Sequence, residues 1–207
     1  MNIFLIGGGE CFPSQLNHMV QMKNGSSILI IPFATELEKR YRWLRRLIKS
    51  LAHNGFKSVD ILHQDLSLKR MKEKINQADL LYFTGGRPEE LIKILNQKNL
   101  TKVIQSHHGA IIGYSAGALA LCEECLITKD HVYPETKLIQ GVGLIPFTVE
   151  VHYSPAIDIE LTLWSKGRTI YALPNGSSLF YDGEKIEVLG KIYVFQEGKK
   201  KLECTPF

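Results

Sequence analysis

The sequence has few cysteines and no long hydrophobic run. Its 207 residues contain four cysteines, and their uneven spacing offers no disulfide framework. Such cysteine usage predicts a reducing, cytoplasmic compartment. No apolar stretch approaches the ~20 residues that a membrane-spanning helix requires. The first residues, Met1 to Ile6, lack the basic lead of a signal peptide. We therefore expect a soluble chain with no membrane partner.

Cys122 and Cys125 have the spacing of a redox pair. A thioredoxin-type pair opens a helix near the start of its fold, whereas these two follow a helix that begins after Ser115. We therefore expect both thiols to be buried or idle.

Signatures of nucleotide and nucleic-acid binding are also missing. Gly7-Gly8-Gly9-Glu10 lacks the Gly-x-Gly-x-x-Gly spacing, and no Gly-Lys-Ser/Thr phosphate loop occurs. The net charge of +4 is mild, and there is no zinc-finger spacing, aromatic RNA-binding signature or charged tail. Basic residues concentrate in 36–54, which predicts an amphipathic helix with a solvated basic face. Its expected apolar stripe is Leu37, Tyr41, Leu44, Ile48 and Leu51. No nucleic-acid partner is expected.

Short β-branched runs alternate with helical patterns through the first two thirds of the chain. The expected strands are 2–6, 27–31, 58–62, 80–84 and 110–114, and the expected helices are 15–22, 36–54, 69–76, 88–97 and 116–122. Thr35 and Glu38 form a capping box before the long helix, and Gly55 ends it. This alternation predicts a mostly parallel sheet with helices on both faces. The length predicts a single α/β domain, 1–207.

The pattern changes after about residue 129. A strand at 148–151, a helix at 155–166 and a strand at 169–173 are expected. Asp182-Gly183 and Glu197-Gly198 are turn signals between short strands, which predicts a β-meander at the C-terminus.

Gly113-Tyr114-Ser115-Ala116-Gly117 follows the apolar run Ala110-Ile111-Ile112 directly. A strand that reverses sharply into a helix needs little side-chain bulk beside the turn, and the turn exposes the central hydroxyl. Ser115 is therefore a candidate nucleophile. The alternative is an ordinary glycine-rich turn between a strand and a helix.

A second glycine loop, Thr84-Gly85-Gly86-Arg87, lies at the expected carboxyl end of a strand. Loops at these strand ends gather around the ligand site of an open parallel sheet. The N–H groups of Gly86 and Ala116 are therefore candidates for receiving the oxyanion of an acyl-transfer intermediate. A simple loop with positive φ is the alternative for Gly85-Gly86.

A serine hydroxyl needs a neighbouring base before it becomes a nucleophile at neutral pH. Among seven histidines, His152 ends the expected strand 148–151, which would present its ring at the carboxyl edge of the sheet. We favour His152 as the base, with a purely structural histidine as the alternative. The other six are less well placed, because they lie before the elbow or after a turn: His18, His53, His63, His107, His108 and His131.

Segments along nearly the whole chain resemble, in order, the dipeptidase E and cyanophycinase family of serine peptidases. They are Phe4 to Glu10, Tyr82 to Gly86, Gly113 to Ala118, Val151 to Tyr153 and Ala172 to Gly176. The resemblance implies a class I glutamine amidotransferase-like fold with serine in place of cysteine. It implies hydrolysis of dipeptides or short peptides without a metal or organic cofactor. It also implies Ser115 as nucleophile, His152 as base and then acid, and Gly86 with Ala116 as oxyanion hole.

The chain departs from this family at Asn175, where family members carry a glutamate as the third catalytic residue. An asparagine carbonyl can orient the imidazole but supplies no negative charge, and the equivalent exchange lowers turnover ~10⁴-fold in a serine protease. Asp130 resembles an aspartate found after the elbow in dipeptidase E relatives, and Asp158 and Asp182 are further candidates for the acid. Each of these aspartates has a turn or capping role as its alternative.

Three functions remain open from the sequence. The first is a serine peptidase, and the second is a catalytically weak binding homologue, because of Asn175. The third is an α/β-hydrolase esterase, but that fold places its histidine near the C-terminus and none follows His152. Lys166 and Arg168 lie near the position of a substrate-binding basic residue in dipeptidase E relatives, but their spacing differs. The oligomeric state is open between monomer and homodimer.

Overall fold

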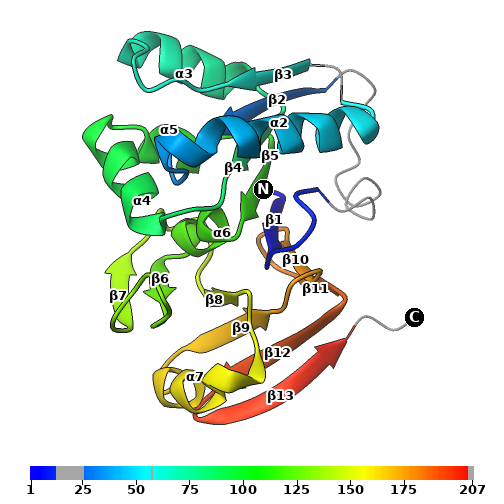
Figure 1. Ribbon diagram of the computed structural model, residues 1–207, viewed down its shortest axis with the longest axis vertical. Coiled ribbons are helices and arrows are strands. Elements are labelled where there is room, and N and C mark those ends of the chain that lie inside the picture. Colours follow the sequence, from blue (N-terminus) through cyan, green and yellow to red (C-terminus); the bar gives the residue numbers. More distant parts are fainter. Residues whose placement is uncertain (13–25, 57, 205–207) are drawn as a thin grey trace.

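The central sheet brings strands from both ends of the chain together. A computed structural model describes residues 1–12, 26–56 and 58–204, so the predicted helix 15–22 lies outside the described residues. Within them the sheet has seven strands in the order β11-β10-β1-β5-β4-β2-β3 (Figure 1). The parallel strands are β1 (Ile3–Ile6), β2 (Ser27–Ile31), β3 (Ser58–Ile61), β4 (Leu80–Phe83) and β5 (Ala110–Tyr114). All five match predicted strands, and the mostly parallel α/β sheet is confirmed.

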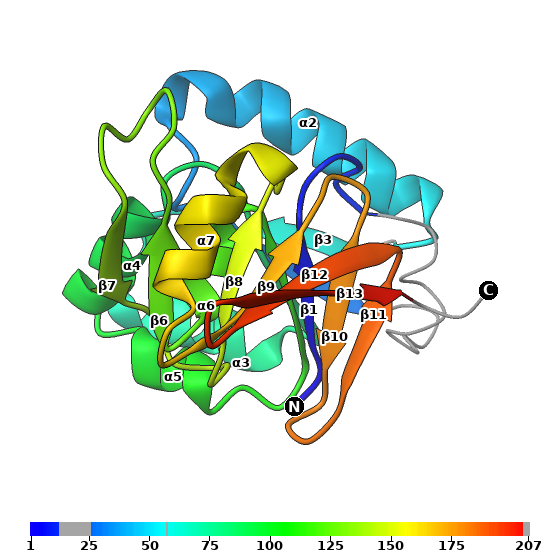
Figure 2. The ribbon, with the colours of Figure 1, turned by 90° about the horizontal axis from the view of Figure 1, so that it is seen from below.

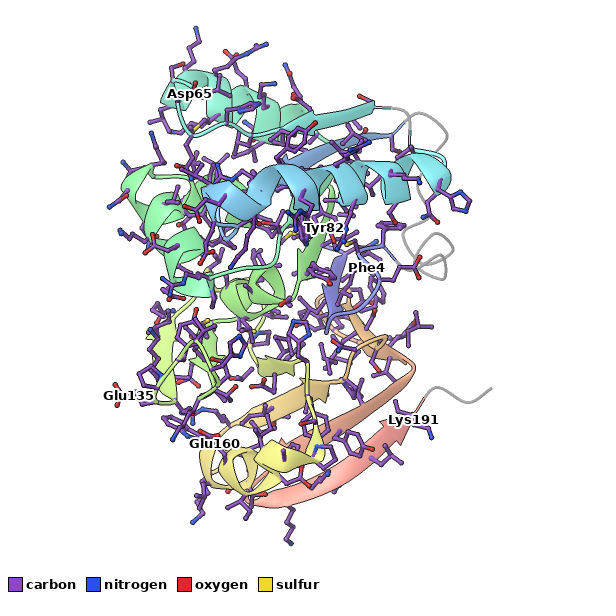
Figure 3. All side chains as sticks on the ribbon, in the orientation of Figure 1. Phe4, Asp65, Tyr82, Glu135, Glu160 and Lys191 are labelled. Atoms are coloured by element: carbon purple, nitrogen blue, oxygen red, sulfur yellow. The ribbon has the colours of Figure 1, made fainter. Side chains whose placement is uncertain are left out.

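Alternating side chains of these strands form two separate apolar layers. On one face, Leu5 and Phe83 pack with α3 (Leu68–Gln77), α4 (Pro88–Gln97), α5 (Thr101–Gln105) and α6 (Ala116–Leu121). On the other face, Phe4 and Tyr82 pack against α2 (Leu37–His53). Figure 2 shows α2 on the opposite side of the sheet from α3 and α5, and Phe4 and Tyr82 are labelled in Figure 3. The predicted helices on both faces are therefore present.

The start and the buried stripe of α2 differ from the prediction. Its N-cap is Glu36, which makes no side-chain cap bond, so the predicted capping box is wrong. Thr35 instead donates its hydroxyl to the carbonyl oxygen of Gly85 (2.8 Å). Leu37 and Tyr41 are 77% and 78% exposed. The buried positions are Leu47 and Leu51, with Trp43 and Leu44 packed beside them. Trp43 packs beside the rings of Tyr82 and Tyr114, so this face of α2, and not the face with Leu37 and Tyr41, lies against the sheet.

A second sheet, in the order β13-β12-β9-β8, lies below the central one in Figure 1. Its strands are β8 (Thr148–Val151), β9 (Thr169–Leu173), β12 (Lys191–Gln196) and β13 (Lys199–Cys204). The predicted helix 155–166 is a 3₁₀ turn, η1 (Pro155–Ile157), followed by α7 (Asp158–Trp164). Leu161 of α7 packs on this sheet against Ile170 and Phe195.

The C-terminal antiparallel strands are confirmed, but they are divided between the two sheets. β10 (Ser178–Tyr181) pairs with β1, and β11 (Ile186–Leu189) pairs with β10. β12 instead pairs with β9 and β13. Three short elements escaped prediction: α5 and a two-stranded sheet of β6 (Glu124–Ile127) and β7 (Lys137–Gln140). Across the described ranges, no helix combines the length and apolar character needed to cross a bilayer.

Candidate active site

Ser115 lies at the junction between β5 and α6, as the sequence predicts. Its backbone has φ 52° and ψ −116°, an uncommon conformation for a residue with a side chain. A Cβ on Gly113 would lie 2.7 Å from Ala118 Cα, and one on Gly117 would lie 2.4 Å from the carbonyl oxygen of Phe83. Both flanking glycines are therefore required by the close approach of the helix to the strands. The turn holds Ser115 with 9% of its surface exposed.

His152 follows the last residue of β8 and also has a positive φ, 52°. Its backbone N–H donates to the carbonyl oxygen of Gly7 (2.8 Å), which ties the end of β8 to the end of β1. The ring lies between two side chains. Nε2 is 2.7 Å from Ser115 Oγ, and Nδ1 is 2.6 Å from Asn175 Oδ1. Residues from the ends of β5, β8 and β9 thus form one continuous chain of polar contacts.

The contact with Asn175 determines which ring nitrogen carries the proton. Because Oδ1 of Asn175 is an acceptor, His152 Nδ1 donates to it and Nε2 is left as an acceptor. The Ser115 hydroxyl then donates to Nε2. This is the arrangement in which imidazole can remove a proton from a serine hydroxyl. The amide orients the ring without adding a negative charge.

Gly8 lies against the contact between His152 and Asn175. A Cβ on Gly8 would lie 2.2 Å from Asn175 Oδ1 and 2.3 Å from His152 Nδ1, and its φ is +141°. The loop is held by the Tyr114 hydroxyl, which donates to the carbonyl oxygen of Gly9 (3.0 Å), and by Gly176 N–H, which donates to the carbonyl oxygen of Gly8 (3.0 Å). The first glycine loop therefore forms the backbone support of the imidazole. Its role was not apparent from the sequence.

Gly86 lies in the loop between β4 and α4 and lines the same cavity as Ser115. It has φ +134°, and an added Cβ would lie 2.0 Å from the carbonyl oxygen of Ala34. Arg87 N–H donates to that same oxygen (2.8 Å). Ala116 is the first residue of α6, where a helical N–H has no acceptor within the helix. The Gly86 N–H of this loop and the Ala116 N–H at the start of α6 thus both border the cavity beside the candidate nucleophile.

A cavity of about 210 Å³ opens beside Ser115, between the two sheets. Its walls come from the loops after β4 and β5, the end of β6, the end of β8 and the start of η1. The lining of the cavity contains both apolar and polar side chains. The lining residues are Gly86, Pro88, Ser115, Ala116, Leu119, Ile127, Thr128, Lys129, Asp130, Tyr133, Glu150, Val151, His152, Ser154 and Ile157.

Glu150 is the residue of this cavity that sequence reasoning missed. It is 5% exposed, and its Oε1 accepts from the Thr128 hydroxyl (3.3 Å). Burial raises the pKa of Glu150 to about 8, and the nearby carboxylates of Glu160 and Asp130 act in the same direction. The available signal was an acidic residue between Val149 and Val151 in a short apolar strand, two positions before His152.

Within the described residues, the hydrogen bonds of the candidate acids go to groups other than the imidazole. Asp130 lines the cavity, but its Oδ1 accepts from two backbone N–H groups of its own turn (2.7 and 2.8 Å). Asp158 accepts from the Tyr153 hydroxyl (2.6 Å), and Asp182 accepts from backbone N–H groups of its own turn. The turn interpretation fits Asp130 and Asp182. The partner of His152 Nδ1 is Asn175.

Other residues singled out in the sequence lie outside the cavity. Arg168 donates to Glu124 (2.9 Å) and to the carbonyl oxygen of Trp164 (2.8 Å), so it closes the C-terminal end of α7. Cys122 and Cys125 are free and buried, and burial raises the pKa of the Cys122 thiol to about 12. The prediction that both thiols are buried is confirmed. In the described part of the chain, no group of three His, Cys, Asp or Glu residues is arranged to hold a metal ion.

The sequence of the chain matches the sequences of known peptidases. The profile of peptidase family S51 matches residues 3–189. Peptidase E of a Nostoc species is 26% identical, over 90% of this chain and 84% of its own length. Peptidase E of Haemophilus influenzae is also 26% identical, over 88% of this chain and 82% of its own length.

Solved structures give the same fold. A peptidase from an acI-B1 Actinobacterium superposes with a TM-score of 0.75 at 18% identity, covering 98% of this chain and 93% of its own. A peptidase E-type protein of Listeria monocytogenes EGD-e superposes with a TM-score of 0.74 at 22% identity, covering 91% of this chain and 97% of its own. At these identities the structures support the fold alone.

Proposed function

The chain belongs to peptidase family S51, and we propose that it hydrolyses dipeptides or short peptides with Ser115 as nucleophile. The observation that carries this proposal is the 2.7 Å contact between Ser115 Oγ and His152 Nε2. Hydrogen-bond distance is the geometry that a base needs to take the hydroxyl proton. The cavity of about 210 Å³ beside this contact favours a small substrate. A family of peptidases gives no support to the esterase alternative.

The reaction follows from the positions of these groups. Ser115 Oγ attacks the peptide carbonyl carbon while its proton moves to His152 Nε2. The negative charge on the carbonyl oxygen is received by the N–H groups of Gly86 and Ala116. His152 then gives its proton to the departing amine, which leaves an ester on Ser115. A water molecule, activated by the same ring, hydrolyses the ester and restores the enzyme.

A fluorophosphonate probe combined with a dipeptide panel tests this proposal. We expect the probe to attach to Ser115, because phosphonylation needs an activated serine, and mass spectrometry of the digested protein would locate the adduct. We also expect the unmodified protein to release free amino acids from dipeptides, and the labelled protein to release none. Labelling at another serine, or undiminished hydrolysis after labelling, contradicts the proposal.

The compartment and assembly of the protein stay predictions. The described cysteines Cys11, Cys122 and Cys125 are free thiols, which supports the predicted cytoplasmic location. We propose a short peptide as the partner, no nucleic acid, and a monomer or homodimer. One domain, 1–207, remains our expectation.

Asn175 favours a second candidate function, a peptidase fold that binds peptides but turns them over slowly. Replacing Asn175 by aspartate keeps the shape of the side chain and places a carboxylate next to Nδ1, where the amide oxygen now lies at 2.6 Å. The charge stabilises imidazolium, so we expect kcat for dipeptides to rise by about tenfold or more. In a serine protease, the exchange of aspartate for asparagine lowers kcat ~10⁴-fold because the histidine adopts the wrong tautomer. We expect a smaller gain here, because His152 already has the correct tautomer.

The variant Asn175→Ala is the matched control, because it removes the acceptor without adding charge. We expect its kcat to fall below that of the unmodified protein. Hydrolysis that appears only with Asn175→Asp supports the second candidate. Equal rates in all three proteins would mean that the residue beside Nδ1 does not govern turnover.

A further inference from the structure

Glu150 is a buried acid in the wall of the cavity that contains Ser115. Val149 and Val151 of β8 pack into the main core. Glu150 lies between them, on the opposite face of the strand, because successive side chains of a strand alternate. Its Oε2 is buried and has no hydrogen-bond partner within the described chain. Burying a carboxyl oxygen without a hydrogen bond costs free energy, and a ligand that donates a hydrogen bond to it would remove this cost.

The surroundings of Glu150 favour a cation as that ligand. Glu160 of α7, labelled in Figure 3, and Asp130 of the cavity wall both act on the Glu150 carboxyl as negative charges. Two acids, Glu150 and Asp130, therefore line the cavity, and a third, Glu160, acts on Glu150 from outside the lining. Lys129 also lines the cavity, but the negative groups are the more numerous.

We propose that Glu150 selects substrates whose residue on the acyl side of the scissile bond has a long basic side chain, lysine or arginine. This rests on the proposed function, because it assumes that Ser115 attacks the carbonyl of that residue. Glu150 lies two positions before His152, with only the extended residue Val151 between them, so the two Cα atoms are about 7 Å apart. Leu119, Ile127 and Ile157 line the cavity and can contact the methylene stem. The charged end of the side chain then donates to Glu150.

A pair of substrates that differ only in the side-chain ammonium tests this inference. Lysyl and norleucyl dipeptides share the α-amino group, the stem and the leaving residue. We expect kcat/KM for the lysyl peptide to exceed that for the norleucyl peptide by about tenfold to a hundredfold, because a hydrogen bond between charged groups contributes this much. In Glu150→Gln, which keeps an acceptor for Thr128, we expect the ratio to fall to near one.

The exposed acid Glu187 on β11 gives a matched control, because Glu187→Gln removes the same charge away from the cavity. We expect this control to keep the lysyl preference. Equal kcat/KM values for the two peptides in the unmodified protein overturn the inference. A preference that survives in Glu150→Gln also overturns it, and would assign the recognition of the side-chain ammonium to other acids.

Binding separates a failure of this inference from a failure of the proposed function. Calorimetry with Ser115→Ala compares lysinamide with norleucine amide in the absence of turnover. Tighter binding of lysinamide, by about tenfold, supports Glu150 as the selecting acid even if no peptide is hydrolysed. Equal binding, or no binding of either amide, overturns the inference whether or not peptides are hydrolysed.

The selectivity ratio also depends on pH. Burial raises the pKa of Glu150 to about 8, so the carboxylate forms as pH rises through that value. We expect the lysyl to norleucyl ratio to increase between about pH 7 and 9, while the lysine ε-ammonium stays charged up to its pKa of about 10.4. Titration of His152 affects both peptides equally and cancels in the ratio. The other titratable groups around the carboxyl in the described chain are Asp130, Glu160, Tyr133, Lys129 and the Cys125 thiol of β6. A flat ratio across this range contradicts the inference.

Discussion

Replacing Ser115 by alanine is expected to lower kcat for dipeptide hydrolysis by roughly 10⁴–10⁶-fold. In the proposed mechanism the hydroxyl oxygen forms the ester, and His152 Nε2, 2.7 Å away, is its base. A methyl group can do neither. The residual rate expected reflects the proposed oxyanion donors and the cavity, which the substitution leaves in place.

The loss should occur without a loss of folding. The elbow is held by backbone contacts, because Ser115 N–H donates to the carbonyl oxygen of Ile6 (2.9 Å) and the Ser115 carbonyl oxygen accepts from Ala118 N–H (2.8 Å). Steady-state kinetics give kcat, and thermal unfolding gives the stability of each variant. Ser106→Ala is the control, because Ser106 is exposed at the end of α5, outside the cavity. A Ser115→Ala protein within tenfold of the control would exclude Ser115 as nucleophile.

The parts of the fold that the sequence predicts best are those determined locally. One example is the elbow, which joins the strand 110–114 directly to the following helix. The glycines on either side of Ser115 indicate in the sequence itself that strand and helix pack closely there. The same holds for α4, whose bounds match the prediction, because Pro88 at its first turn marks its start. The alternation of strands with helices was sufficient to predict the parallel sheet and the helices on both of its faces.

Contacts between distant segments could not be predicted in the same way. The residues alone favoured His152, because it lies at the end of an expected strand. Asn175 was singled out only through the family resemblance, and its contact with His152 results from the pairing of β8 with β9 in the second sheet. Glu150 was missed because a single acid in a strand gives no periodic signal. Trp43, and not Tyr41, belongs to the buried stripe of α2, because its ring packs beside Tyr82 and Tyr114 of the central sheet. In each case the deciding contact joins segments that no local pattern connects.

Replacing Gly8 by alanine is expected to lower kcat by about 10²–10⁴-fold, although Gly8 takes part in no chemical step. Its Cβ would lie 2.2 Å from Asn175 Oδ1 and 2.3 Å from His152 Nδ1, so at least one of these groups must move. Moving the ring lengthens the contact between Nε2 and Ser115 Oγ. A displacement of about 1 Å in such a contact is enough for a loss near 10²-fold.

Backbone strain has to be separated from this collision, because Gly8 has φ +141° and alanine is strained there in any surroundings. Gly183 provides the matched control. It has φ +113°, and a Cβ placed on it meets nothing within 4 Å. Gly183→Ala therefore has the strain without the collision, and we expect its kcat to stay within a few-fold of the unmodified protein.

The rate of fluorophosphonate labelling at Ser115 identifies the step that Gly8→Ala affects. Labelling needs the contact between His152 and Ser115 but no bound peptide, so it should slow in parallel with kcat. If labelling keeps its rate while peptide hydrolysis falls, the substitution disturbs peptide binding rather than the imidazole. If Gly8→Ala and Gly183→Ala show the same kinetics, the glycine loop does not position the ring. The collision predicts a loss in both measurements for Gly8→Ala alone, because the backbone of this loop occupies the space beside Nδ1.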